Sequence, residues 1–99
     1  MRTIRDCINA AAEAGGVTSA DITGRDRARR AAWPRQVAMW MARDAGHTMS
    51  KIGRFLGGRD TSTIYAGSSA AARRYDSDEE FGDMMQKAWN IYAAKEARQ

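Results

Sequence analysis

Hydrophobic residues recur every three or four positions along most of the chain, which is the spacing of one buried face on an α-helix. The first such stretch ends at Gly15-Gly16, a pair typical of a helix C-cap, and its buried positions are Ile4, Cys7, Ile8 and Ala11. Thr18-Ser19-Ala20-Asp21 predicts a short capped turn with Ile22 pointing inward. Residues 25–33 carry five charges and no apolar period, which predicts a basic loop.

Four further helices are predicted beyond this loop. Pro34 is expected at the first position of the next helix, because its missing N–H would be unpaired there anyway, and the buried face would be Val37, Trp40, Met41 and Ala45. Thr48 and Asp60 have the short polar side chains that cap helices. The apolar face after Thr48 is Met49, Ile52, Phe55 and Leu56, and Gly57-Gly58 closes this helix.

The helix after Asp60 is expected to run to about Tyr75, with a core-facing row of Ile64, Ser68, Ala71 and Tyr75. Asp76-Ser77-Asp78 would then start a last helix, because acidic residues stabilise the positive end of the helix dipole. Its 3–4 repeat is Phe81, Met84, Met85, Ala88, Ile91 and Tyr92. The fold class predicted from these elements is all-α, with residues 1–99 forming a single domain.

Composition narrows the functional classes. The chain has 99 residues with one proline, nine glycines and one cysteine, which argues against an all-β fold, a disulfide framework and most zinc sites. No apolar run reaches the roughly 18 residues that a membrane span needs, and no signal-like segment precedes the first helix. We therefore expect a cytoplasmic protein without metal or cofactor. No nucleophile, base and orienting group stand together, so the chain is not expected to be an enzyme.

The positive charge is concentrated in the middle of the chain. Residues 25–59 contain nine basic and two acidic residues, whereas the rest contains seven basic and ten acidic ones. Eight of the nine central cations are arginines, whose planar fork suits phosphate and guanine. A solvated basic surface and a nucleic-acid site both fit this pattern, because clustered cations release counterions from phosphate.

Two short helices joined by a glycine-containing break and followed by a capped third helix form a helix-turn-helix arrangement. A recognition helix needs short polar side chains in its first turn, where bulk would hold it out of the groove. Asp60, Thr61, Ser62 and Thr63 meet this requirement. Asp accepts from the cytosine amino group, and Thr offers a hydroxyl and a methyl group.

The segment from Ile52 to Ile64, IGRFLGGRDTSTI, closely resembles the signature of the C-terminal DNA-binding domain of DnaA, the bacterial replication initiator. Trp33 to Met39, WPRQVAM, resembles the Pro-Arg-Gln helix start of the same family. The likeness covers the chain from about Ile4 to Tyr92. It implies a Trp-repressor-like helical fold that binds double-stranded DNA. A monomer on the DNA is favoured among the possible oligomeric states, and the expected location is the nucleoid in the cytoplasm, for a bacterial or a phage protein.

The resemblance also implies three kinds of DNA contact. Arg27 occupies the place of the loop arginine that enters the minor groove, where narrow A·T tracts attract cations. The turn at Asp60, Thr61, Ser62 and Thr63 occupies the base-reading position in the major groove. Arg35 and Gln36 occupy phosphate-clamping positions at a helix N-terminus. Further contacts to the phosphate backbone would come from Arg25, Thr48, Met49, Ser50, Lys51, Arg54 and Arg59.

Three positions depart from the family pattern. Thr61 stands where the family has histidine, Gly67 where it usually has alanine, and Ala70 where it has a basic residue. The loss of the imidazole changes the surface offered to a base pair, so the family's usual DNA site is not carried over. Gly67 is interpreted as sequence drift in preference to a close approach, although glycine inside a helix costs about 1 kcal/mol against alanine.

Three functions follow from these observations. The first is a transcription regulator, whose C-terminal helix offers Trp89 and Tyr92 as a patch for RNA polymerase, a sigma-like protein or another protein partner. It is similar in this respect to activators of phage-like and gene-transfer-agent genes, by analogy alone. The second is a replication modulator that occupies DnaA-box-like origin sites. The third is a protein-interaction module that has lost DNA binding, for which Thr61 and Ala70 are the support.

Overall fold

The structure is a computed structural model that describes residues 2–25 and 29–97 of the chain. The described residues form helices and no strand, so the predicted all-α class is confirmed. The helices are α1 (Ile4–Gly15), α2 (Ser19–Thr23), α3 (Arg29–Asp44), α4 (Met49–Phe55), α5 (Thr61–Ser77) and α6 (Glu79–Ala97). Within the described part of the chain, no helix is long and apolar enough to cross a membrane.

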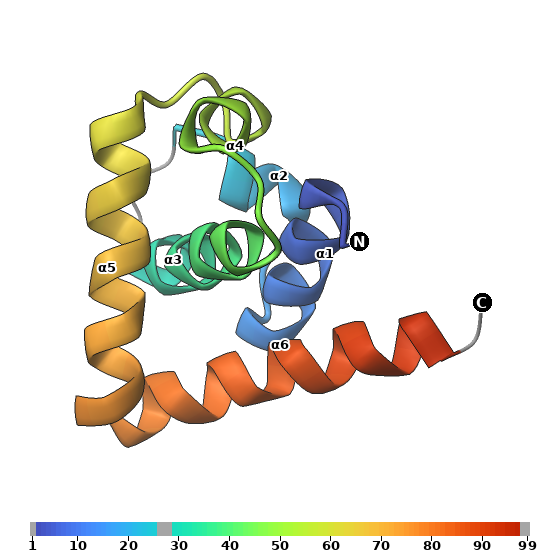
Figure 1. Cartoon of the computed structure of the whole chain (residues 1–99). Helices are drawn as coiled ribbons and strands as arrows, with labels where there is room; N and C mark the ends of the chain where they lie inside the picture. The colour runs from blue at the N-terminus through green and yellow to red at the C-terminus, as the bar shows by residue number, and fades with distance from the viewer. Residues whose placement is uncertain (1, 26–28, 98–99) are drawn as a thin grey trace.

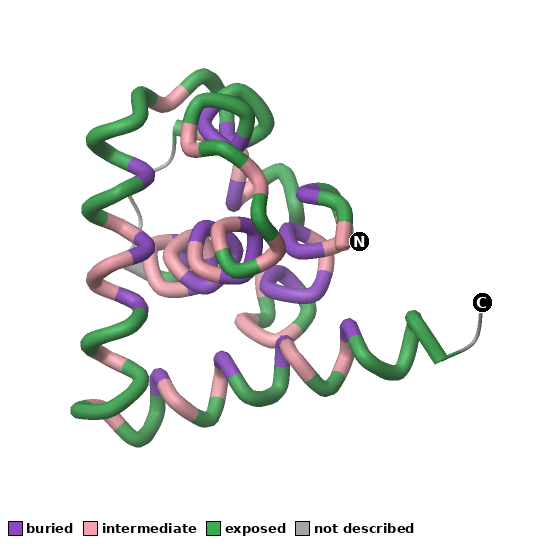
Figure 2. The backbone as a smooth tube through the Cα atoms, in the orientation of Figure 1, coloured by how far each residue is buried: buried purple, intermediate pink, exposed green. Residues whose placement is uncertain are grey.

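Helix α3 runs through the middle of the molecule. Figure 1 shows α1 on one side of it, α5 on the other, α4 near the start of α5, and α6 along the base. The largest helix–helix contacts join α3 to α1 and α5, and α1 to α6. The buried faces of these helices turn toward one another, as Figure 2 shows. The core is built mainly from Cys7, Ile22, Val37, Met41, Ile52, Leu56, Ile64, Phe81 and Met85.

The predicted helix caps are confirmed. Thr18 and Asp21 form a reciprocal capping box, with two side chain–backbone hydrogen bonds of 3.0 Å each. Gly16 ends α1 in the left-handed conformation at φ +69°. Thr48 accepts from the Lys51 N–H at 3.1 Å and so caps α4. These side chains act on backbone groups within three residues, which is why the sequence alone predicts them.

The predicted basic loop at residues 25–33 is partly wrong, because α3 begins at Arg29 and Pro34 lies inside the helix. Tertiary packing favours this earlier start. Ala31 is fully buried, and the Trp33 ring packs edge-on against Phe81 with ring centroids 5.3 Å apart. Pro34 packs against α1 at Gly15, where an added Cβ would collide with the proline ring. These contacts offset the backbone hydrogen bond that a proline removes.

Several predictions at the end of α5 are also corrected. Asp76 and Ser77 finish α5 and do not start α6. The cap of α6 is Asp78, whose Oδ1 accepts from the Phe81 N–H at 3.0 Å. Tyr75 does not face the core, because 46% of its surface is exposed. The side chain lies near the corner at which α5 gives way to α6, where it lines a surface groove.

Two aromatic predictions elsewhere are revised. Phe55 was expected on the buried face of α4 but is 42% exposed. Tyr92 was expected in an exposed patch with Trp89, yet it is buried against the core. The 3–4 repeat of α6 therefore predicts the position of Tyr92 better than the patch interpretation does.

Gly67 has a packing role, which corrects the interpretation as drift. A Cβ at Gly67 would collide with the sulfur of Met39, a buried residue of α3. The missing side chain therefore lets α5 pack close to α3. Because a methionine side chain is flexible, the constraint at this position is mild.

Candidate nucleic-acid interface

The backbone of the α4–α5 turn is tightly constrained. The Gly53 carbonyl accepts from the N–H groups of Gly58 at 2.9 Å and of Arg59 at 3.0 Å, so the chain folds back over α4. A Cβ at Gly53 would collide with the Arg59 carbonyl. Gly57 and Gly58 have φ angles of +78° and +80°, which side-chain-bearing residues rarely adopt. The glycines predicted to close α4 therefore make this turn possible.

The same turn lies against α2. A Cβ at Gly57 would collide with the Thr23 carbonyl oxygen, which belongs to the last residue of α2. No other element separates the end of α2 from the turn before α5. The end of α2, with Gly24 directly after it, is consequently held near the start of α5.

Asp60, Thr61, Ser62 and Thr63 are all exposed at the first turn of α5, as the capped helix start predicts. Asp60 Oδ1 accepts from the Thr63 N–H and from the Ser62 hydroxyl, both at 2.9 Å. These hydrogen bonds, the backbone one first, hold the pKa of the Asp60 carboxyl below its usual value. Asp60 thus organises the turn, and the Ser62 hydroxyl oxygen retains acceptor capacity.

Arg35 does not stand at a helix N-terminus, because α3 begins six residues earlier. Its guanidinium turns toward the end of α2. Nε donates to the Ile22 carbonyl at 2.8 Å, and Nη2 donates to the carbonyls of Asp21 at 2.8 Å and Gly24 at 3.3 Å. The last carbonyls of a helix have no partner within the helix, so Arg35 supplies the donors that α2 lacks.

Arg59 reaches the same carbonyls from the α4–α5 turn. Nη2 donates to the Gly24 carbonyl at 2.7 Å, and Nη1 donates to the carbonyls of Thr23 at 3.4 Å and of Leu56. Two arginines that are 24 positions apart in the sequence therefore converge on one helix end. Together they connect α2, α3 and the turn before α5.

The two guanidiniums also lie close to each other. Burial lowers the pKa of Arg59 first, and the charges of Arg35 and Arg25 lower it further. An arginine stays protonated despite such a shift. The cluster is therefore a partly buried concentration of positive charge beside the exposed first turn of α5.

The other predicted contact residues are distributed around this cluster. Gln36 is half-buried, and its Oε1 accepts from Arg74 Nη1 at 3.5 Å. Met49 is half-buried at the start of α4. Arg27 lies outside the described residues. The exposed members of the predicted set are Arg25, Thr48, Ser50, Lys51 and Arg54.

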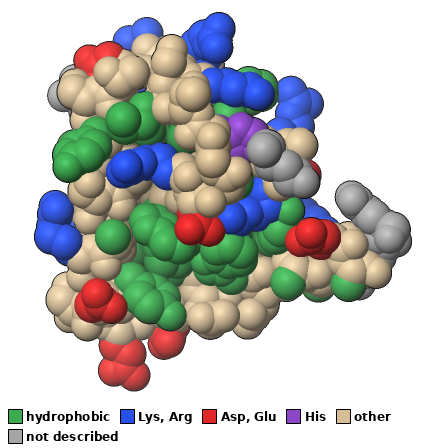
Figure 3. Space-filling view, in the orientation of Figure 1, with side chains coloured by type: hydrophobic (Ala, Val, Ile, Leu, Met, Phe, Trp, Pro, Cys, Tyr) green, Lys and Arg blue, Asp and Glu red, His purple; other side chains and the backbone are tan. Residues whose placement is uncertain are grey.

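The surface charge has two regions. Figure 3 shows Lys and Arg side chains gathered over α4, whereas several Asp and Glu side chains lie at the corner where α5 meets α6. A shallow groove of about 390 Å³ lies between α3 and α5, lined by residues that include Gln36, Arg59 and Thr63. The basic residues of α4 and of the α4–α5 turn thus precede the exposed first turn of α5.

Sequence reasoning missed the role of α2 as the acceptor for both arginines. The sequence does contain a signal for this role. A helix as short as α2, which ends at Thr23 and is followed by Gly24, has carbonyl groups that need hydrogen-bond donors from other elements. The structural contact of His47 was also missed. Its Nε2 lies 2.6 Å from the carbonyl oxygen of Arg2. That contact holds the N-terminal segment on the turn after α3.

Cys7 and the metal-ligating residue types are the other possible sites of nucleophilic or metal chemistry. Cys7 is fully buried, and burial raises the pKa of its thiol to about 11, which opposes formation of a reactive thiolate. No group of His, Cys, Asp and Glu that could hold a metal occurs among residues 2–25 and 29–97. The interface is built from hydroxyls, amides and guanidiniums.

Comparison with known proteins gives a consistent set of similarities. Residues 4–69 match the family model of the bacterial DnaA protein helix-turn-helix. The chromosomal replication initiator protein DnaA of Caulobacter vibrioides is 43% identical over 63 residues, which are 63% of this chain and 13% of that protein. The DnaA of Symbiobacterium thermophilum is 33% identical over 86 residues, which are 86% of this chain and 19% of that protein. The chain therefore spans less than a fifth of the length of these relatives.

Proposed function

Because the chain belongs to the bacterial DnaA helix-turn-helix family, we propose that it binds specific double-stranded DNA sites, with the first turn of α5 in the major groove. The observation that carries this proposal is the exposed polar turn at Thr61, Ser62 and Thr63, presented by a tightly constrained backbone. Short hydroxyl side chains on a fixed helix start suit direct contact with base edges.

The cations divide into two groups in this proposal. Arg25, Lys51 and Arg54 are exposed, and they neutralise phosphates beside the groove without reading sequence. Arg35 and Arg59 donate to the carbonyls of α2 and position the turn. The resemblance assigns Arg27, which lies outside the described residues, to the minor groove.

Binding to a randomised duplex library at two salt concentrations tests the proposal. We expect an enriched sequence and an affinity that falls steeply with salt, with a log–log slope of about −0.9 for each phosphate neutralised. Ser62→Ala should relax the preference at one or two base pairs, at about 1–3 kcal/mol each. Ser69→Ala, a serine on the same helix beyond the turn, is the matched control. A chain that ignores duplex at low salt would be a protein-interaction module, and the proposal would be wrong.

We further propose that binding regulates transcription. The acidic and aromatic α6 supports this role, because it leaves a surface for a protein partner at a distance from the DNA. The names of the relatives support an alternative, a modulator that occupies origin sites. Mapping the enriched sequence onto promoters or onto origins separates the two roles, and sedimentation of the complex tests whether one chain binds each site.

A further inference from the structure

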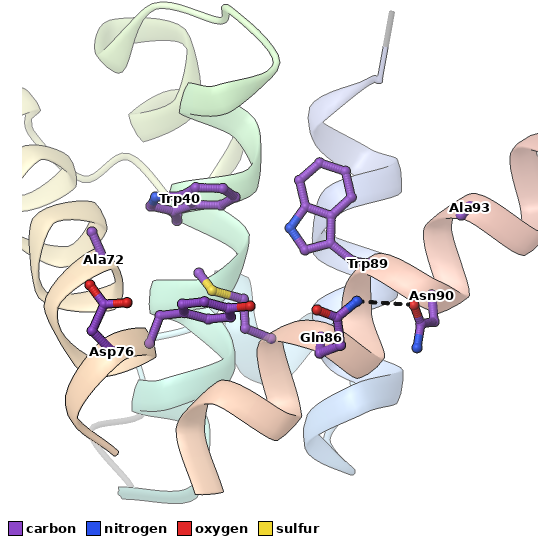
Figure 4. Close-up of a pocket in the computed structure, with 9 residues that line it drawn as sticks. Trp40, Ala72, Asp76, Gln86, Trp89, Asn90 and Ala93 are labelled. Atoms are coloured by element: carbon purple, nitrogen blue, oxygen red, sulfur yellow. Dashed lines mark hydrogen bonds between the residues drawn. The ribbon is translucent and has the colours of Figure 1, made fainter. Parts of the chain in front are cut away.

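An aromatic groove lies between α3, α5 and α6, far from the base-reading turn. It has a volume of about 580 Å³, and its walls include Trp40, Tyr75, Met85 and Trp89. The rings of Trp40 and Trp89 meet edge to face with centroids 6.1 Å apart. Figure 4 shows these two rings on facing helices, with Gln86 and Asn90 at the rim and joined by a hydrogen bond of 3.2 Å. Exposed apolar surface with a polar rim marks an interaction site.

The groove is open because α6 packs only one of its faces on the domain. Phe81, Met85, Ala88 and Tyr92 form the buried row, whereas the neighbouring row of Gln86, Trp89, Asn90 and Ala93 lines the groove. This second row spans about two helical turns, or about 10 Å. A trough of that length fits the i, i+3/i+4 and i+7 anchors of an amphipathic helix.

The charge around the groove indicates which kind of helix fits. Asp76 lies on the groove wall, and residues 75–97 contain six acidic but only two basic residues. Aromatic rings add to the attraction for a cation. The protein already makes such a contact in the same region, since the Arg2 guanidinium lies 4.1 Å from the centre of the Trp89 ring.

A second copy of this chain does not fit the groove as well. Nine of the sixteen basic residues lie between positions 25 and 59, and Lys and Arg side chains gather over α4, a surface that the proposed function assigns to DNA. Tyr75 and Asp76 are 14 and 15 residues beyond Thr61 on the same helix, which is about 21–23 Å along its axis. The groove and the base-reading turn can therefore be occupied together.

We propose that this groove docks an amphipathic helix of another protein, with Lys or Arg beside its apolar stripe. The proposal rests on the proposed function only for the exclusion of a second copy, because docking itself requires no DNA. It also changes the predicted partner surface. Trp89 remains part of it, but Trp40 and Tyr75 take the place of the buried Tyr92. The buried Tyr92 ring packs edge to face against Trp89, with ring centroids 6.4 Å apart.

Two synthetic helical peptides test the groove on the full chain without DNA. They share a stripe of leucines at i, i+3, i+4 and i+7, and one carries Lys beside the stripe where the other carries Glu. We expect the Lys peptide to bind at least about tenfold more tightly by calorimetry, because Asp76 lies on the groove wall and acidic residues predominate in residues 75–97. Equal binding of both peptides, or binding of neither, would overturn the proposal.

Charge and shape are then tested separately by variants. Tyr75→Ala should weaken the Lys peptide about tenfold or more, because aromatic anchors dominate such interfaces. Asp76→Lys should reverse the preference toward the Glu peptide, and a lysine near the end of a helix is favourable for folding. The matched controls are Tyr65→Ala and Asp83→Lys, an exposed tyrosine of α5 and an exposed carboxylate of α6 outside the groove.

Further outcomes test the location of the site, its occupant and its independence from DNA. If Tyr65→Ala and Asp83→Lys weaken peptide binding as much as the groove variants do, the assignment of the binding site to the groove is wrong. A dimer in sedimentation that Tyr75→Ala dissociates would assign the groove to a second copy and overturn the proposed occupant. Tyr75→Ala should leave the affinity for duplex DNA unchanged. A chain that binds the Lys peptide but no DNA would refute the proposed function and leave the docking proposal intact.

Discussion

The two ends of α5 are built on different principles. At its start, the backbone is constrained by hydrogen bonds to the Gly53 carbonyl and by close backbone contacts at Gly53 and Gly57. At its end, Tyr75 stands 46% exposed over an open groove that side chains leave unfilled. One end presents small polar groups on a constrained frame, and the other offers a large apolar surface.

This difference teaches how a small domain can separate two tasks. The proposed reading of base edges needs groups placed within a fraction of an ångström, and the hydrogen bonds at the start of α5 suit that need. The proposed docking of a helix needs area and adaptable side chains such as Met85, and it tolerates a less constrained wall. Substitutions at the two ends should therefore have different consequences.

The largest expected effect is that of Gly53→Ala. The new Cβ would collide with the Arg59 backbone carbonyl, so the turn would have to move, at an expected cost of at least about 3 kcal/mol in the free energy of unfolding. Urea denaturation measures this loss. Gly67→Ala is the control, because its collision is with the flexible Met39 side chain and the helix gains about 1 kcal/mol from alanine. Equal losses in both variants would contradict the constrained turn.

Loss of an inward-facing arginine should come next. Arg35→Met and Arg59→Met leave the α2 carbonyls without donors, which should lower the free energy of unfolding by about 2–3 kcal/mol. Both variants should bind DNA more weakly with an unchanged salt dependence. Arg54→Met, at an exposed arginine, should leave stability unchanged and reduce the salt slope by about 0.9. A slope reduced equally by Arg35→Met would mean that this guanidinium contacts a phosphate.

A smaller effect is expected at the other end of α5. Tyr75→Ala should lower the free energy of unfolding by less than about 1 kcal/mol, because the tyrosine is half exposed and packs on one side only. Phe81→Ala, at a fully buried ring, should cost about 3–5 kcal/mol. Thermal denaturation compares the two. A large loss at Tyr75 would show that the groove wall is part of the core.

The smallest effect concerns the pH dependence of the α5 cap. The pKa of Asp60 is lower in the folded chain than its usual value, so the cap stabilises the fold above the usual carboxyl pKa. That contribution should fall away as the pH drops through the lowered pKa. Asp60→Asn keeps a capping side chain that does not titrate. The difference between the two proteins in acid denaturation should therefore vanish at the lowest pH, and a constant difference would contradict it.

Much of the fold could be predicted because its signals are local. Thr18, Thr48 and Asp60 cap helices through N–H groups three residues away, and the apolar repeats place Ile22, Ile64 and Phe81 inside. The start of α3 was missed because its reason is the packing of Ala31 and Pro34 on distant elements. The exposed polar turn was predicted, while its contact with bases stays a prediction.

The sequence by itself determined which segments are helices, where most of them are capped, and that a polar turn follows Gly57-Gly58. These features depend on residues within one or two helical turns of each other. Only the tertiary structure decided which way the arginines point. Arg35 and Arg59 bond to carbonyls of residues 21–24, at sequence separations of 11 to 14 and of 35 and 36. The unpaired carbonyl groups at a helix end can accept hydrogen bonds from residues that are distant in the sequence. The local charge pattern does not show which arginine will supply those donors.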